Sequence, residues 1–418
     1  MRALLKSRGE RLAECKRWIE AIGLSLSSAA LLAIAGCGGG GGAGPATTSA
    51  APAASTSAPG TSAPSGTPPT SGAPTLADCD MFPANAIFNT RIDDTAKFPV
   101  DAKSGTWLDR VGRSVPFSTD WGNDADPSHT LTYFGMPINV VDGSASTTTW
   151  PVVSFDFAPS GMSIAQGYPD RSDCAVANAS GGFDIARNCA SVAPAQRRFP
   201  FPVDGKVLSQ GGICNDPASC GDHPVLVVEK GACRLWESYF AFDLSNQWYA
   251  MATVAWDLKS LALRPNGWGS ASASGLPITP LLAKAAEASS GEIRHALRVN
   301  FNGAKLAQQA RWPARFATGW GGTDAIPFGA LLRLRADFTI PDDWTPQAKA
   351  LAIAAKRYGL YVADNGPDFY AQGEPNAAWD MRTSAQMKTI TMGDMEFVDL
   401  SSITGNARFD IDSMAASW

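Results

Sequence analysis

Glu237 is the residue whose type and surroundings best suit acid catalysis. It lies in the segment Arg234-Leu235-Trp236-Glu237-Ser238-Tyr239, which reads as an aromatic strand. A carboxylate beside Trp and Tyr is partly desolvated, which raises its pKa and suits a general acid. The alternatives are a solvent-facing glutamate on an edge strand or a glutamate paired with Arg234.

Two further carboxylates could complete a catalytic pair with Glu237. Asp222 and His223 stand just before an apolar strand, where a loop meets a sheet, although an aspartate there can also merely cap a turn. Asp364 belongs to the turn Asp364-Asn365-Gly366, which follows a short apolar strand. Because glycoside hydrolysis uses two carboxylates, we expect Asp222 or Asp364 to partner Glu237.

Four polar residues are candidates for positioning a substrate: His223, His295, Arg298 and Asn365. On a strand, Glu292, Arg298 and the residues between them at every second position share one face, whereas His295 points to the other face. His295 therefore reads more readily as a buried, hydrogen-bonded core histidine than as a catalytic base. No cofactor is expected, because the phosphate-binding, dinucleotide and His-Glu-x-x-His signatures do not occur.

Metal binding is not expected. A polar loop contains Asp124, Asp126 and His129. A calcium-binding loop requires more oxygen ligands at fixed spacing. The cysteines contain no Cys-x-x-Cys pair. An exported chain with an even cysteine count favours disulfides over zinc.

Six cysteines remain after the leader, and we predict that they pair as Cys174–Cys189, Cys214–Cys220 and Cys79–Cys233. The first two would be local bridges that hold a loop excursion over residues 160–222. Tryptophan is abundant, with 13 in the chain. Aromatic planes stack on sugar rings, so these side chains favour a glycan-binding cleft, but a large β domain also buries many aromatics.

The elements that would position these residues are mostly short strands rich in Val, Tyr, Trp and Phe. Strands are predicted over residues 131–141, 150–157, 224–229, 234–242, 247–258, 293–301 and 330–340. Residues 243–246 predict a hairpin. In the last strand, Leu332 and Leu334 alternate with Arg333 and Arg335, which predicts one core face and one solvent face.

A helix is predicted from Pro346 to Arg357, with Thr345 as N-cap and Gly359 just past its end. Residues 280–289 indicate a second helix. The predicted fold is mainly β, an antiparallel, jelly-roll-like β-sandwich with two or three helices and a disulfide-held loop excursion.

The N-terminal segment indicates export. Residues 1–36 combine six basic residues with a short apolar run and end at Ile34-Ala35-Gly36-Cys37, which resembles the bacterial lipobox. We expect Cys37 to be lipidated and to anchor the protein in the membrane of the bacterial cell envelope, the outer membrane in a Gram-negative cell. Residues 37–76 form a Gly/Ala/Ser/Thr/Pro tether without charges, expected to be disordered. Residues 77–418 form one large domain.

The charge of the chain argues against nucleic acid as a partner. The formal net charge is −5, and six of the basic residues lie in the leader, so the domain itself is more acidic. Partners are therefore expected to be the membrane, through the lipid, and a glycan.

Several motifs occur together along the domain: Val225-Leu226-Val227-Val228, Leu235-Trp236-Glu237, Gly275-Leu276-Pro277-Ile278, His295-Ala296-Leu297-Arg298, Trp312-Pro313-Ala314-Arg315 and Ala363-Asp364-Asn365-Gly366. In this order they resemble a family of secreted bacterial proteins, many from soil organisms, over residues 82–398. Members of that family carry Asp where this chain has Ser272 and His where it has Phe316. They also carry Asp-Arg-His in place of Asp222-His223-Pro224. These departures imply a divergent or inactive member.

Together these features lead to one functional expectation and two alternatives. The first is a surface lipoprotein that acts on polysaccharide, as a glycoside hydrolase or a lyase that uses carboxylates. The alternatives are a non-catalytic glycan-binding module and a structural envelope lipoprotein.

Overall fold

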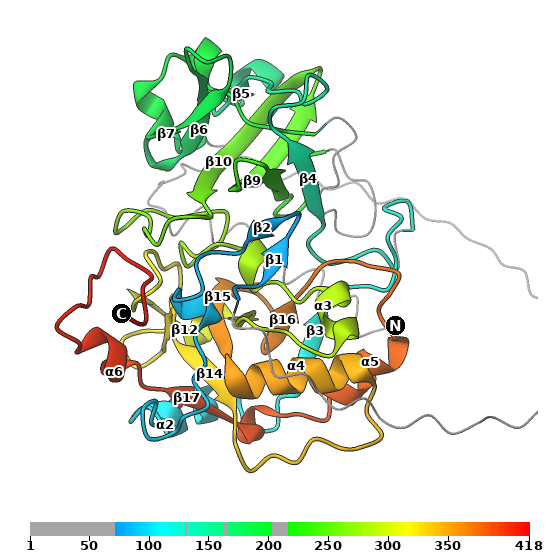
Figure 1. The fold of residues 1–418 in the computed structure, drawn as a ribbon, viewed down its shortest axis with the longest axis vertical. Helices are drawn as coiled ribbons and strands as arrows, with labels where there is room; N and C mark the ends of the chain where they lie inside the picture. The colour runs from blue at the N-terminus through cyan, green and yellow to red at the C-terminus, as the bar shows by residue number, and fades with distance from the viewer. Residues whose placement is uncertain (1–71, 130–131, 162–165, 203–215, 219) are drawn as a thin grey trace, which may run out of the picture.

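The computed structural model describes residues 72–418 except 130–131, 162–165, 203–215 and 219 (Figure 1). The described part is mainly β, as expected, with helices over short stretches. The signal peptide, Cys37 and nearly all of the tether lie outside the described residues, so the lipid anchor stays a prediction. Within the described ranges, no helix has both the length and the apolarity that crossing a bilayer requires.

One sheet has five strands in the order β4-β8-β9-β10-β5. Their bounds are β4 Ile138–Asp142, β8 Val225–Lys230, β9 Arg234–Leu244, β10 Gln247–Asp257 and β5 Val153–Ser154. The predicted hairpin between β9 and β10 is confirmed, with its turn at Ser245 and Asn246, whose φ values are 57° and 63°. Positive φ at both central residues defines the type I′ turn that suits the twist of a two-residue hairpin.

A second sheet has six strands in the order β17-β14-β15-β11-β16-β3. Their bounds are β17 Met395–Val398, β14 Leu331–Leu334, β15 Leu360–Asn365, β11 Leu297–Phe301, β16 Tyr370–Gln372 and β3 Ser118–Asp120. Figure 1 shows this sheet in the lower half of the molecule and the five-stranded sheet in the upper half.

Both sheets are mixed, so the predicted all-antiparallel pairing is wrong. β4 pairs parallel to β8, β5 to β10, β11 to β15, and β16 to β3. Parallel neighbours need a long connection, and here those connections carry helices and the segments that cross between the sheets. Within the described residues, three two-stranded pairs complete the β structure: β1 (Thr75–Leu76) with β2 (Cys79–Asp80), β6 (Asp173–Ala177) with β7 (Phe183–Arg187), and β12 (Leu306–Ala310) with β13 (Ile326–Phe328).

The strongest helix prediction is confirmed. α4 spans Pro346–Arg357, the Thr345 hydroxyl accepts from the backbone N–H of Ala348 at 3.1 Å, and Gly359 has a φ of 78°. The second predicted helix begins later than expected, as α3 over Ala285–Ser290, because Pro280 lies in the 3₁₀ turn Thr279–Leu281 that precedes it. The other α-helices among the described residues are α2 (Ser104–Val111), α5 (Met381–Met387) and α6 (Ser401–Thr404).

Hydrophobic packing covers both faces of the five-stranded sheet. Leu235 of β9 belongs to the main core cluster, which also contains Leu297 and Val299 of the six-stranded sheet. Trp236, the next residue, belongs to a second cluster beneath the β6–β7 hairpin. Successive side chains of β9 therefore enter different cores, so this strand is buried on both faces.

The expected solvent face of residues 330–340 is wrong at Arg333. β14 ends at Leu334, and the Arg333 side chain is buried. Its guanidinium pairs with Glu396 at 2.7 Å and donates to the backbone carbonyls of Ile92 and Phe98. The alternating pattern gave the wrong prediction here because the segment that contains Ile92 and Phe98 covers the face that alternation assigns to solvent.

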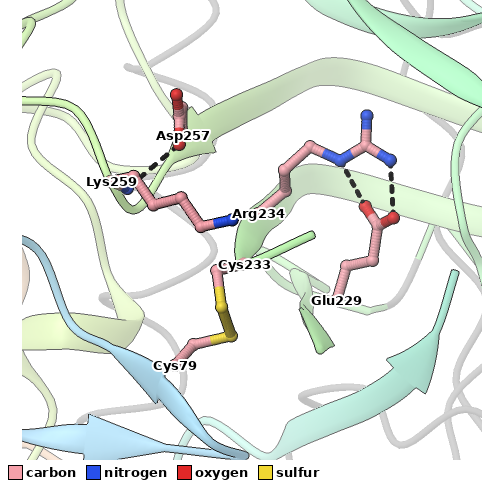
Figure 2. Close-up of a disulfide and its surroundings, with 6 residues drawn as sticks. All are labelled: Cys79, Glu229, Cys233, Arg234, Asp257 and Lys259. Atoms are coloured by element: carbon pink, nitrogen blue, oxygen red, sulfur yellow. Dashed lines mark hydrogen bonds and ion pairs between the residues drawn. A yellow bond between two sulfur atoms is a disulfide. The ribbon is translucent and has the colours of Figure 1, made fainter. Parts of the chain in front are cut away.

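Two of the three predicted disulfides can be compared with the described residues. Cys79 and Cys233 are bridged, as predicted, which ties β2 to the turn between β8 and β9 (Figure 2). Cys220 is disulfide-bonded, but Cys214 lies outside the described residues, so the Cys214–Cys220 pairing stays a prediction. Cys174 and Cys189 are instead free, buried thiols. They lie close enough to interact, and burial raises the pKa of the Cys189 thiol.

An ion-pair cluster, rather than a closed Cys174–Cys189 bridge, fastens the β6–β7 excursion. The Asp173 carboxylate is buried and binds Arg187 at 2.5 Å, the fully buried Arg264, and the backbone N–H of Ala255 at 3.0 Å. These partners come from β7, from the segment after β10 and from β10 itself. The hairpin is thereby held against the five-stranded sheet.

Candidate functional site

Glu237 is fully buried on β9, on the face that looks toward the six-stranded sheet. Its Oε1 accepts from the backbone N–H of Ile278 at 2.9 Å, from the backbone N–H of Thr279 at 2.8 Å and from the Thr279 hydroxyl at 3.1 Å. Its Oε2 shares only the Ile278 N–H, at 3.1 Å. The segment that follows Gly275 therefore wraps the carboxylate with donors.

The alternative in which Glu237 pairs with Arg234 is wrong. Arg234 binds Glu229 through two hydrogen bonds of 2.7 and 2.5 Å (Figure 2). Trp236 Nε1 donates to the same carboxylate at 2.8 Å. The edge-strand alternative is also wrong, because β9 lies between β8 and β10. Glu237 is instead a central-strand glutamate turned toward the interior.

Arg298 of β11 is the charged partner that the structure brings toward Glu237. Its side chain is fully buried, and its Nη2 donates to Asp364 Oδ2 at 2.8 Å and to the Ser272 hydroxyl at 3.1 Å. Ser272 in turn donates to the carbonyl of Ala363 at 2.7 Å. Arg298 thereby connects β11 with β15 and with the segment that leads to Ile278.

Three carboxylates act electrostatically on Arg298: Asp364, Glu237 and Asp120. Burial lowers the pKa of the Arg298 guanidinium, and these carboxylates oppose that effect. Burial raises the pKa of Glu237, although the donors from Thr279 and Ile278 and the charge of Arg298 counteract it. Burial also raises the pKa of Asp364, against Arg298 and two backbone N–H donors. Two acids with raised pKa values thus flank one arginine, a pattern common at functional sites.

The polar side chains near Arg298 lie on one face of the six-stranded sheet. Ala371 of β16 lies opposite Val299 of β11, so Gln372 and Arg298, one position away, emerge together on the other face. Asp120 of β3 is the register partner of Gln372. Asp364 of β15 is the register partner of Asn300.

This face holds buried polar atoms without partners. Arg298 Nε and Nη1, Asn300 Oδ1, Gln372 Oε1 and the Tyr361 hydroxyl make no hydrogen bond to any described residue. Buried polar groups are almost always satisfied in native proteins, by protein, water or ligand. Such atoms on one face of a sheet mark positions that oxygen atoms of water or of a ligand can satisfy.

Asn365 stands beside this cluster at its more exposed end. Its backbone N–H donates to Asp364 Oδ1 at 3.0 Å, and its side-chain nitrogen donates to the Thr318 hydroxyl. Its Oδ1 is another buried atom that no described residue binds. The side chain of Asp364 is 21% exposed, whereas that of Arg298 is 0% exposed. The cluster therefore reaches solvent at Asp364 and Asn365.

His295 lies in a separate buried cluster, as its predicted direction implied. Its Nε2 is 2.8 Å from Glu287 Oε2 and 3.2 Å from Lys284 Nζ, and its Nδ1 donates to the carbonyl of Ala296. Burial would raise the pKa of Glu287, but Lys284 and His295 outweigh it and lower the pKa to about 2. This arrangement accounts for His295 as a structural partner of α3.

Asp222 and His223 lie against the far half of β9. The backbone carbonyls of Asp222 and His223 accept from Phe240 and Ala241. The His223 ring is buried, stacks on Phe242 and donates from Nδ1 to the carbonyl of Ala241 at 2.6 Å. These contacts give His223 a structural role at this end of the sheet.

Most of the tryptophans are part of the core, so their abundance does not mark a cleft. The buried ones are Trp107, Trp121, Trp236, Trp256, Trp312, Trp344 and Trp379. Of the described tryptophans, Trp320 and Trp418 are exposed, at 37% and 47%. The alternative that a large β domain buries its aromatics therefore describes this chain better.

We call the group formed by Arg298 and the polar residues described around it the Arg298 cluster: Glu237, Ser272, Asn300, Asp364, Asn365 and Gln372. Two other features lie apart from it. A surface hollow lined by Asp101, Arg311, Trp312 and Val398 occurs at the β17 edge of the six-stranded sheet. In the polar loop noted above, His129 Nδ1 lies 2.8 Å from Asp124 Oδ2. Across the described ranges, no group of three or more His, Cys, Asp or Glu side chains is arranged to hold a metal ion.

The comparisons with known proteins add no identity. No protein-family model, no curated protein and no solved structure matches this chain. The resemblance to secreted bacterial proteins therefore stays a prediction, and the site rests on its own geometry.

Proposed function

We propose that this chain is an exported, lipid-anchored envelope protein that acts on polysaccharide as a hydrolase or lyase at the Arg298 cluster. The observation that carries the proposal is the convergence of Glu237 and Asp364, which come from different sheets, on a buried arginine with unpaired N–H groups. Glycosidic bond cleavage needs an acid and a second carboxylate, and raised pKa values suit the acid.

Glu237 is the proposed acid, and Oε2 is the oxygen that can carry its proton. Oε1 accepts from three donors, whereas Oε2 shares a single N–H with Oε1. A proton on Oε2 therefore displaces the fewest hydrogen bonds. Asp364 is the proposed second carboxylate, since it binds Arg298 directly and has exposed surface.

A second candidate function, glycan binding without catalysis, is favoured by one observation. Both Glu237 and Arg298 are 0% exposed, so in this conformation neither touches a polymer in solution. A binding or structural protein requires no access to these groups. The experiment therefore has to separate turnover from binding.

The test uses the mature chain from Cys37 with a panel of soluble polysaccharides. We expect release of new chain ends, measured as reducing sugar, and loss of that release in Glu237→Gln. Glu292→Gln is the matched control, because Glu292 carries the same side chain on a loop outside the Arg298 cluster. Retention on a glycan without any release of chain ends would replace the enzyme by the binding protein.

A further inference from the structure

The charge around Arg298 constrains what can bind beside it. With Glu237 protonated as the proposed acid, Asp364 and Asp120 are the carboxylates that act on the Arg298 guanidinium, so negative charges still outnumber the positive charge. The Arg298 side chain is already paired with Asp364 through Nη2. An anion brought to this arginine meets these two carboxylates in a site of low dielectric, where like charges repel strongly.

The unpaired atoms constrain the ligand further. Arg298 Nε and Nη1 are donors and need acceptors, whereas Asn300 Oδ1, Gln372 Oε1 and Asn365 Oδ1 are acceptors and need donors. An ammonium group has only donors and leaves the Arg298 N–H groups unsatisfied. A hydroxyl both donates and accepts, so a group of hydroxyls satisfies both sets.

We infer that the Arg298 cluster takes a neutral, hydroxyl-rich glycan and cleaves it by hydrolysis, in preference to a polyuronate or an amino-sugar polymer. This inference rests on the proposed function and selects hydrolysis over elimination. Elimination requires a uronate, because the sugar's own carboxyl group acidifies the neighbouring C–H bond. The carboxylates around Arg298 disfavour that group.

Glu237, Asp364 and one water molecule supply every proton and bond that the hydrolytic step requires. The Glu237 proton passes to the glycosidic oxygen as its bond to the anomeric carbon breaks. A water oxygen bonds to the anomeric carbon, and its proton passes to the second carboxylate, Asp364. Because Glu237 and Arg298 are 0% exposed, this step requires the cluster to open at its solvent-facing end, at Asp364 and Asn365, before a sugar reaches them.

The experiment compares three polymer classes with the mature protein. Neutral glucan, xylan, mannan and arabinan are set against pectate and alginate and against chitosan. Migration in gels that contain each polymer measures binding. Reducing ends measure total cleavage, and the ultraviolet absorbance of unsaturated uronates measures elimination.

We expect a neutral polymer to retard the protein and to yield saturated reducing ends. Asn365→Ala should weaken that retardation by about tenfold, because it removes one acceptor at the exposed end of the cluster. Asn406→Ala, at an exposed asparagine outside the cluster, is the matched control. Arg298→Gln should abolish the retardation, with the melting temperature measured to confirm that the variant folds.

The outcomes separate the inference from the function on which it rests. Retardation by a neutral polymer without cleavage supports the ligand class and overturns catalysis. Unsaturated uronates from pectate or alginate overturn the inference and leave polysaccharide cleavage standing. Retardation by chitosan or polyuronates alone also overturns the inference, and the absence of binding and cleavage with every polymer overturns both.

Discussion

Arg234 binds Glu229 through both carboxylate oxygens, five residues back along the chain. Glu237 lies on the opposite face of β9, where the backbone N–H groups of Ile278 and Thr279 donate to it. Glu237 makes no direct ion pair, because its charged neighbour Arg298 is paired with Asp364. This arrangement is the structural basis for proposing Glu237 as the acid.

Glu237→Gln should preserve the fold and remove activity. The amide oxygen can still accept from Thr279, while the amide nitrogen replaces Oε2 and cannot transfer a proton. Loss of a general acid lowers kcat by on the order of a hundredfold or more. Kinetics on an accepted polysaccharide, with Glu292→Gln as control, measure the effect. Unchanged kcat would remove Glu237 from the mechanism.

Acid should destabilise the protein through Glu287. Its folded pKa is about 2, below the ordinary 4.5, so its contribution to stability is present above pH 4.5 and is lost as the pH falls toward 2. The shift corresponds to about 3 kcal/mol. Glu287→Gln should flatten this part of the stability curve, measured by denaturant unfolding between pH 2 and 6. An unchanged acid slope would contradict the role of Lys284 and His295.

Asp173→Asn should be strongly destabilising. It leaves Arg264, which is 0% exposed, without its buried counter-charge. Breaking a buried pair in this way costs about 3–5 kcal/mol. Asp337→Asn, in the exposed Arg335–Asp337 pair, is the control and should leave the melting temperature unchanged. Equal melting temperatures for both variants would show that the Asp173 cluster does not fasten the β6–β7 hairpin.

Thiol chemistry should distinguish the cysteines. Peptide mapping without reduction should join Cys79 to Cys233. Cys174 and Cys189 should resist a thiol reagent in the folded protein, because both are buried, and should react after denaturation. A bridged Cys174–Cys189 peptide from exported protein would instead match the pairing expected from the sequence.

The lipid anchor is tested at Cys37. Cys37→Ser should release the protein from membranes, because the acyl chains attach to that sulfur. Detergent partition of the wild-type and variant proteins measures this. Retention of the variant in the detergent phase would exclude the lipoprotein assignment.

Local signals in the sequence predicted the local structure well. The Thr345 cap, Pro346 and Gly359 bound α4, and residues next to the β9–β10 turn predicted that hairpin, because these patterns act over a few neighbouring residues. Arg333 shows the limit of such patterns. Alternation within a strand cannot reveal that Ile92 and Phe98, far away in the chain, supply carbonyls to its guanidinium.

The site was predictable only residue by residue. Glu237, Arg298 and Asp364 were each chosen from the sequence, but the partner of Glu237 was left open between Asp222 and Asp364, because these residues lie on separate strands of two sheets. Asn300 and Gln372 were missed because each is a single amide in an apolar strand. Their significance comes from sheet register, which places Gln372 on the face of Arg298. Register depends on which strands pair, and the residues of a single strand do not reveal its neighbours.

The Cys79–Cys233 bridge has a mechanical consequence. Tension applied through the N-terminal segment enters the folded domain at β1 and can peel the two-residue pair β1–β2 away. At Cys79 the load passes through the disulfide directly to Cys233, in the turn between β8 and β9. The hydrogen bonds of the chain between these two cysteines, which lie 154 residues apart in the sequence, do not carry it. If the chain is tethered through its N-terminus, as the predicted lipid anchor implies, the load therefore enters the five-stranded sheet between two of its inner strands and not at the end of the domain.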